Sequence, residues 1–241
     1  MPFSFFRRGS GSDDRLDRIE QTIDQMLADD RHAFKLAMAA LLGEVPVDEV
    51  RKEVKQTDRR VNEGERAIRR DLVIHASVAG AIDSPALLVY MSVVKDIERI
   101  GDYAKNLLDL ARDGASLGSH HNWTSRRDEI DRLIVATGEA FAKRDDDGAR
   151  QLLVEGDALL DQFDDEVSAL VRGDDTAGDE IARALALRYL KRVVAHLTNV
   201  LSSVVMPLDR LDYFDEDPED WEAEREGGRP SPRPSGDGQD A

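Results

Sequence analysis

The spacing of apolar residues between positions 86 and 111 constrains the fold more than any other feature of the chain. In this stretch they recur every three or four residues, at Tyr90, Val93, Val94, Ile97, Ile100, Ala104, Leu107, Leu108 and Ala111. Such spacing is typical of an amphipathic helix with one buried stripe. We therefore predict a helix here, whose apolar side must be covered by other elements.

Two local features of this predicted helix disfavour an isolated helix. Glu98 and Asp102 are four residues apart, so both carboxylates project from one side and repel each other, at a cost of a few tenths of a kcal/mol. Gly101 between them costs roughly 1 kcal/mol relative to alanine. Departures of this kind tend to mark functional or tightly packed positions.

Helical periodicity also governs the rest of the chain. We predict helices over 13–42, from Val47 to between Val73 and Ala79, from Asp83 or Ser84 to Gly114, and over 125–144, 147–172 and 177–212. Pro207 is expected to kink the last helix or to end its regular part. No segment alternates apolar and polar residues as a strand does. The predicted fold class is all-α, with three helices followed by three more.

Composition shifts divide the chain into four parts. Residues 1–12 are predicted to be a flexible arm, although their three phenylalanines and two arginines leave contact with a membrane or partner open. Residues 13–117 and 118–214 are the predicted helical domains. Residues 215–241 carry ten acidic and three basic side chains with many Pro and Gly, and are predicted to be a disordered acidic tail.

Charge and composition exclude several classes of function. The formal net charge of −17 disfavours direct binding to nucleic acid, because the phosphate backbone repels an acidic protein. The absence of cysteine excludes disulfides and thiolate metal sites, and fits a reducing cytoplasm. No apolar run approaches the ~20 residues of a membrane span. No phosphate-cradling glycine loop or nucleophile motif is present, so we expect no enzyme activity.

The two halves can be aligned as a repeat with one altered copy. In the first half, Asp58 to Asn62 precede Glu98 to Asp102. In the second half, Asp157 and Asp161 remain, and Tyr189–Val200 falls opposite Asp96–Leu107. In that register Lys191 stands opposite Glu98, Ala195 opposite Asp102 and Val194 opposite Gly101.

The segment KDIERIGDYAKNLLDLA resembles the signature helix of the PhoU family of phosphate-uptake regulators, which typically reads D-L-E-R-I-G-D-x-A-x-N-I-A. The matching residues are Asp96, Glu98, Arg99, Ile100, Gly101, Asp102, Ala104 and Asn106. The resemblance covers about residues 13–213, strongly in the first half and loosely in the second. It implies two tandem three-helix bundles, each with paired E(D)-x-x-x-D motifs that can hold metal ions.

Carried onto this chain, the resemblance implies a metal site made of Glu98 and Asp102, with Asp58 and Asn62 as the facing pair. These oxygen ligands suit Mg, Ca, Mn or Fe, and Zn less well. Because Lys191 and Ala195 replace the acids in the second half, we predict no second metal site. The alternative is that Glu98 simply pairs with a basic side chain such as Arg99 or Lys105.

The same resemblance implies a cytoplasmic negative regulator of phosphate uptake and phosphate-starvation signalling. It would be an adaptor that docks on a PstB-like transporter ATPase and a PhoR-like sensor kinase, and it would be peripheral to the membrane through these partners. The family commonly forms homodimers. Two alternatives stay open: an accessory subunit of a Pit-type or other ion permease, and a carboxylate-cluster metalloprotein with hydrolase activity.

Overall fold

The computed structural model describes residues 13–79, 84–118, 123–173 and 179–212 of the chain. The predicted arm and the predicted tail lie outside these residues. Within them the structure contains six α-helices and a short 3₁₀ helix, and no strand. The elements are α1 (Asp13–Leu41), α2 (Val47–Ala79), α3 (Ser84–Arg112), α4 (Trp123–Lys143), α5 (Asp146–Arg172), α6 (Glu180–Val205) and η2 (Leu208–Arg210). The predicted all-α fold class is confirmed.

The end of the last helix differs from the predicted range of 177–212. Helix α6 stops at Val205, and Met206 is extended, with φ −95° and ψ 150°. The ring of Pro207 disfavours a helical conformation at the residue before it, which explains why the helix stops here. Of the two effects expected of Pro207, the structure therefore shows termination rather than a kink.

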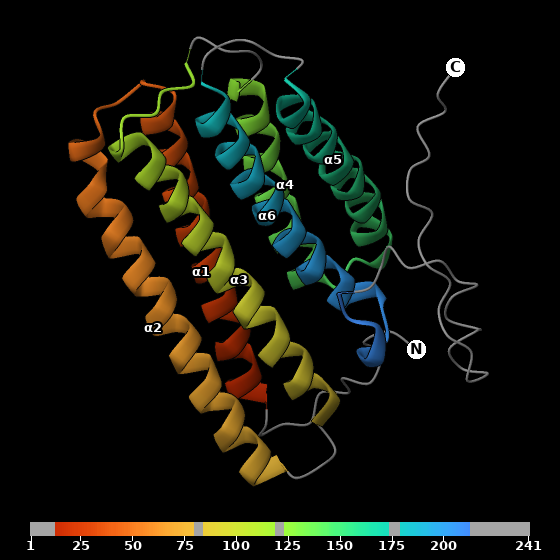
Figure 1. Ribbon diagram of the computed structural model, residues 1–241. Coiled ribbons are helices and arrows are strands. Elements are labelled where there is room, and N and C mark those ends of the chain that lie inside the picture. The colour runs from red at the N-terminus through yellow and green to blue at the C-terminus, as the bar shows by residue number, and fades with distance from the viewer. Residues whose placement is uncertain (1–12, 80–83, 119–122, 174–178, 213–241) are drawn as a thin grey trace, which may run out of the picture.

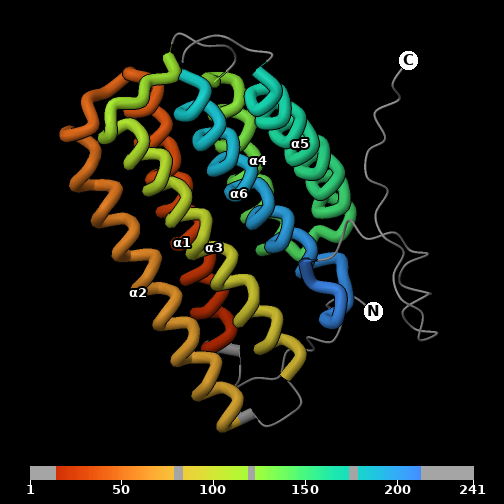
Figure 2. Tube along the Cα trace, in the orientation of Figure 1, coloured from red at the N-terminus to blue at the C-terminus, as the bar shows by residue number. Residues whose placement is uncertain are grey.

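The six helices run up and down in succession and form two groups of three (Figures 1 and 2). Helices α1, α2 and α3 pack on one another, as do α4, α5 and α6. Contacts of α3 with α6 and of α1 with α4 join the groups, while α2 and α5 lie at the outer edges (Figure 1). The two groups share an apolar core, so the domain division at residues 117 and 118 stays a prediction.

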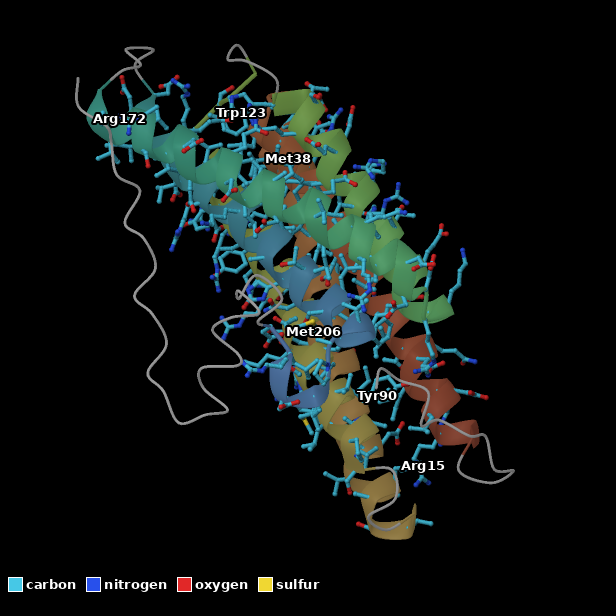
Figure 3. All side chains as sticks on the ribbon, turned by 90° about the vertical axis from the view of Figure 1, so that its right-hand side faces the viewer. Arg15, Met38, Tyr90, Trp123, Arg172 and Met206 are labelled. Atoms are coloured by element: carbon cyan, nitrogen blue, oxygen red, sulfur yellow. The ribbon has the colours of Figure 1, made fainter. Side chains whose placement is uncertain are left out.

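Because successive helices alternate in direction, the ends of different helices meet at the two ends of the molecule. Met38 near the end of α1 and Trp123 at the start of α4 lie at one end of the molecule, whereas Arg15 and Tyr90 lie toward the other (Figure 3). Helix α3 is central because it packs against α1, α2 and α6. All nine apolar residues predicted to form its buried stripe are buried.

A buried polar cluster crosses the contact between α3 and α6. Asp96 on α3 lies with its Oδ1 atom 2.8 Å from Nδ1 of His196, and the same oxygen accepts a hydrogen bond of 2.9 Å from Nδ2 of Asn199. Asp96 and His196 are each 8% exposed. Tyr103 stacks on the His196 ring at a centroid distance of 5.7 Å. Asp96 of the signature segment therefore joins the two halves.

Replacing Asp96 with alanine should destabilise the protein, because His196 and Asn199 would each lose a partner inside the contact. We expect the free energy of unfolding to fall by about 2–3 kcal/mol in urea denaturation. Asp109→Ala is the matched control, since Asp109 lies on the same helix in an exposed pair with Arg112. Equal stability of the two variants would contradict a structural role for the cluster.

Candidate functional site

The predicted acidic residues of α2 and α3 meet through a lysine. Lys105 lies on α3, three residues after Asp102, and its Nζ atom is 3.0 Å from Oδ1 of Asp102. The same Nζ atom is 3.0 Å from Oδ1 of Asp58 on α2. Burial alone would lower the pKa of Lys105, but the hydrogen bonds and the negative charges of Asp58 and Asp102 together raise it overall. The ammonium group is therefore a positive bridge between the two helices.

The other two predicted residues are placed differently. Asn62 donates a hydrogen bond of 2.8 Å from Nδ2 to the backbone carbonyl of Asp58, so its amide nitrogen points back along its own helix. The side chain of Glu98 is only 16% exposed, and it lies 3.7 Å from Nε of Arg99. Burial raises the pKa of Glu98, and the charges of Asp102 and Glu65 raise it further.

Asp30 on α1 belongs to the same cluster and was not among the residues predicted from the sequence. Its side chain is fully buried, and neither carboxylate oxygen has a hydrogen-bond partner among the described residues. Burial raises the pKa of Asp30 well above the usual aspartate value, and the charges of Asp29, Glu98, Asp58 and Asp102 add to this effect. The cluster therefore contains one fully buried carboxyl group, and burial favours its protonated form.

The close approach of Asp30 to α3 explains the glycine in the signature helix. A Cβ atom at Gly101 would lie 2.5 Å from Oδ1 of Asp30, which is closer than real contacts allow. Gly101 thus accommodates the Asp30 carboxyl group rather than bending the helix. The sequence indicates a functional or tightly packed position at Gly101, and this contact gives the structural reason.

A sequence signal for Asp30 does exist. Met26, Leu27, Ala33 and Phe34 are all buried on α1, and Asp30 falls between them on the same apolar stripe. An acidic residue at a core position needs a partner or a raised pKa. The preceding residue, Asp29, instead has a partner, because Nη2 of Arg60 lies 2.6 Å from its Oδ1 atom.

The cluster has the donor chemistry of a metal site but not its closed geometry. Carboxylate oxygens from three helices suit hard cations, and Asp30 supplies two buried oxygens without partners. Among the described residues, however, no three Asp, Glu or His side chains are grouped closely enough to hold an ion. The place between Asp58 and Asp102 belongs to the Lys105 ammonium group. Metal binding by Glu98, Asp102, Asp58 and Asn62 thus stays a prediction.

The second group of helices uses a lysine in a different way. Lys191, which the repeat places opposite Glu98, pairs with Asp164 on α5. Asp157 and Asp161, the acids retained on α5, are both exposed. Lys191 therefore has an acidic partner of its own on α5, and the expected lack of a second metal site stays a prediction.

Comparison with known proteins agrees with the signature helix. The family model of the PhoU domain matches residues 23–111, which include Asp30 and all four predicted ligands. The phosphate-specific transport system accessory protein PhoU homolog of Synechocystis sp. is 27% identical over 206 residues, covering 78% of this chain and 87% of the relative. The resemblance to the PhoU family is thus confirmed, with residues 23–111 matching the PhoU domain.

A solved structure agrees with the fold. The crystal structure of PhoU from Pseudomonas aeruginosa matches with a TM-score of 0.69 at 20% identity, covering 82% of this chain and 98% of the other. At this level of identity the match concerns the fold alone. None of the helices in the described part of the chain combines the length and the apolar character that a membrane span requires.

The buried Asp30 carboxyl group predicts an unusual pH dependence. Its pKa is higher in the folded than in the unfolded chain, so the unfolded chain loses this proton first as the pH rises. This residue's contribution to stability is therefore greatest below the usual aspartate pKa and is lost as the pH rises toward the raised value. Asp30→Asn should remove this loss, which urea denaturation of both proteins from about pH 4 to about pH 8 would measure.

Asp29→Asn is the control for this comparison. It breaks the pair with Arg60, so it should lower stability at neutral pH instead of relieving a cost. Parallel stability curves for the wild type and Asp30→Asn would mean that Asp30 ionises normally in the folded protein, and would contradict a raised pKa at this position.

Proposed function

We propose that the chain is a cytoplasmic accessory protein that restrains phosphate transport and phosphate-starvation signalling. The observation that carries this proposal is the PhoU domain at residues 23–111. It is supported by the alignment with a PhoU homolog named for the phosphate-specific transport system, which extends over 87% of that relative. The proposed role is regulatory and acts through protein contacts rather than through catalysis.

The proposed partners are a PstB-like transporter ATPase and a PhoR-like sensor kinase. Helix α2 supports such docking because it lies at the outer edge of the molecule (Figure 1) and leaves apolar side chains uncovered near its C-terminal end. Val73, Ile74 and Val78 are 62%, 45% and 79% exposed. Uncovered apolar side chains on a helix are suited to contact with a partner protein. We propose that this end of α2 contacts the ATPase, whereas the homodimer stays an expectation from the family.

The second part of the proposal concerns cations. We propose that the carboxylate cluster of the first bundle can take a divalent or iron cation, with Asp30, Asp58, Glu98 and Asp102 as the residues that would hold it. The unpartnered oxygens of Asp30 support this proposal, because a buried carboxyl group without a partner is costly. A bound cation would supply positive charge that links the three helices. The chain itself supplies the oxygen donors, including the buried carboxyl group of Asp30.

Deletion of the gene should raise expression of a phosphate-starvation reporter in cells grown at high phosphate. Expression of the full chain should restore repression of the reporter. The double variant Val73→Glu/Val78→Glu should restore it poorly, because two charges would disrupt the apolar contact. Val154→Glu/Val171→Glu, at sites that are 74% and 82% exposed in the second group of helices, is the matched control and should repress normally.

A reporter that does not respond to deletion would contradict the proposed regulation. Affinity purification of the same variants tests the partner. Recovery of a transporter ATPase with wild type and control, but not with Val73→Glu/Val78→Glu, is expected. Recovery of a Pit-type permease without the ATPase would favour the accessory-subunit alternative.

A further inference from the structure

We propose that Lys105 is a built-in cation of the first-bundle carboxylate cluster and competes there with divalent metal ions. The inference rests on the proposed cation capacity of this cluster and concerns how the site is regulated. When metal is scarce, the ammonium group of Lys105 would bridge Asp58 and Asp102. When a metal ion binds, the ammonium group would leave this place and point into solvent.

The position of Lys105 supports this competition. Its Nζ atom lies between α2 and α3, at 3.0 Å from a carboxylate oxygen of Asp58 and of Asp102. An ammonium group and a divalent cation both favour carboxylate oxygens, so they cannot fill this place together without strong repulsion. Both aspartates are predominantly covered, with side chains 20% and 32% exposed, which limits how far solvent screens the interaction.

The side chain is also able to leave. Lys105 is 39% exposed, and its flexible four-carbon stem can carry the ammonium group into water without unpacking the helix. Departure would leave Asp58 and Asp102 without their shared positive partner. The same region contains Glu98 and the buried Asp30. Burial raises the pKa of both groups, and neighbouring acidic charges, including that of Asp102, raise it further. A divalent ion supplies twice the charge of the ammonium group that it displaces.

Asp30 is the observation that distinguishes this cluster from an ordinary acidic surface. Its carboxyl group is fully buried, has no partner among the described residues and approaches α3 at Gly101. Lys105 makes its two hydrogen bonds to Asp58 and Asp102 and none to Asp30. Lys105 therefore gives Asp58 and Asp102 a positive partner and leaves the buried Asp30 carboxyl group without one in the part of the chain that the structure describes.

Binding of Mn²⁺ to the full chain tests the proposal directly. Isothermal titration calorimetry should show that Lys105→Gln binds Mn²⁺ about tenfold more tightly than the wild type, because the competing charge is gone. Lys191→Gln is the matched control, since Lys191 pairs with Asp164 in the second group of helices. It should bind Mn²⁺ as the wild type does. Without metal, Lys105→Gln should melt at a lower temperature, and Mn²⁺ should raise its melting temperature more than that of the wild type.

Adding Asp30→Asn to Lys105→Gln should abolish the gain in affinity, which places the ion at the buried carboxyl group. The proposal is overturned if Lys105→Gln and the wild type bind Mn²⁺ equally, if neither binds it, or if the gain survives Asp30→Asn. Circular dichroism of each variant establishes that it is folded. Because metal binding is measured without the phosphate-starvation reporter, failure of Lys105 competition and failure of the proposed phosphate regulation give separate results.

Discussion

The structure of the first bundle depends on how closely α1 approaches α3 where Asp30 meets Gly101. A Cβ atom at position 101 would lie 2.5 Å from Oδ1 of Asp30, so the carboxyl group can occupy this place only while position 101 is glycine. The approach removes Asp30 from water and brings its carboxyl group near the charges of Asp58, Glu98 and Asp102. The contact of Asp30 with Gly101 therefore adds a fourth, buried carboxyl group to the cluster.

Basic side chains offset the repulsion between the acidic residues of this cluster. Lys105 links Asp58 to Asp102, and Arg60 pairs with Asp29 beside the buried Asp30. Each basic side chain connects two helices of the same bundle, so the charges contribute to helix packing. On the other side of α3, Asp96 contacts His196 and Asn199 of α6. A single helix thus carries the acidic cluster on one side and the polar contact between the two halves on another.

Much of this architecture could be predicted from the sequence, because a three-and-four spacing of apolar residues determines which side of a helix is buried. The nine residues of the α3 stripe are all buried, and the prediction of an unusual environment at Gly101 has a structural explanation. The role of Asp30 was not predicted, since its contacts depend on α1 packing against a segment distant in the sequence. The bridging by Lys105 likewise depends on its rotamer and on Asp58 across the bundle, although the sequence did identify Lys105 as a possible acid partner.

The central claim is that burial and the nearby acidic charges raise the pKa of Asp30 well above the usual aspartate value. Carbon NMR of the full chain labelled at the aspartate carboxyl carbons tests it most directly, with the Asp30 signal assigned from its loss in Asp30→Asn. We predict that this signal keeps the chemical shift of a protonated carboxyl group well above the pH at which exposed aspartates ionise. An Asp30 signal that titrates together with those of exposed aspartates would contradict the claim.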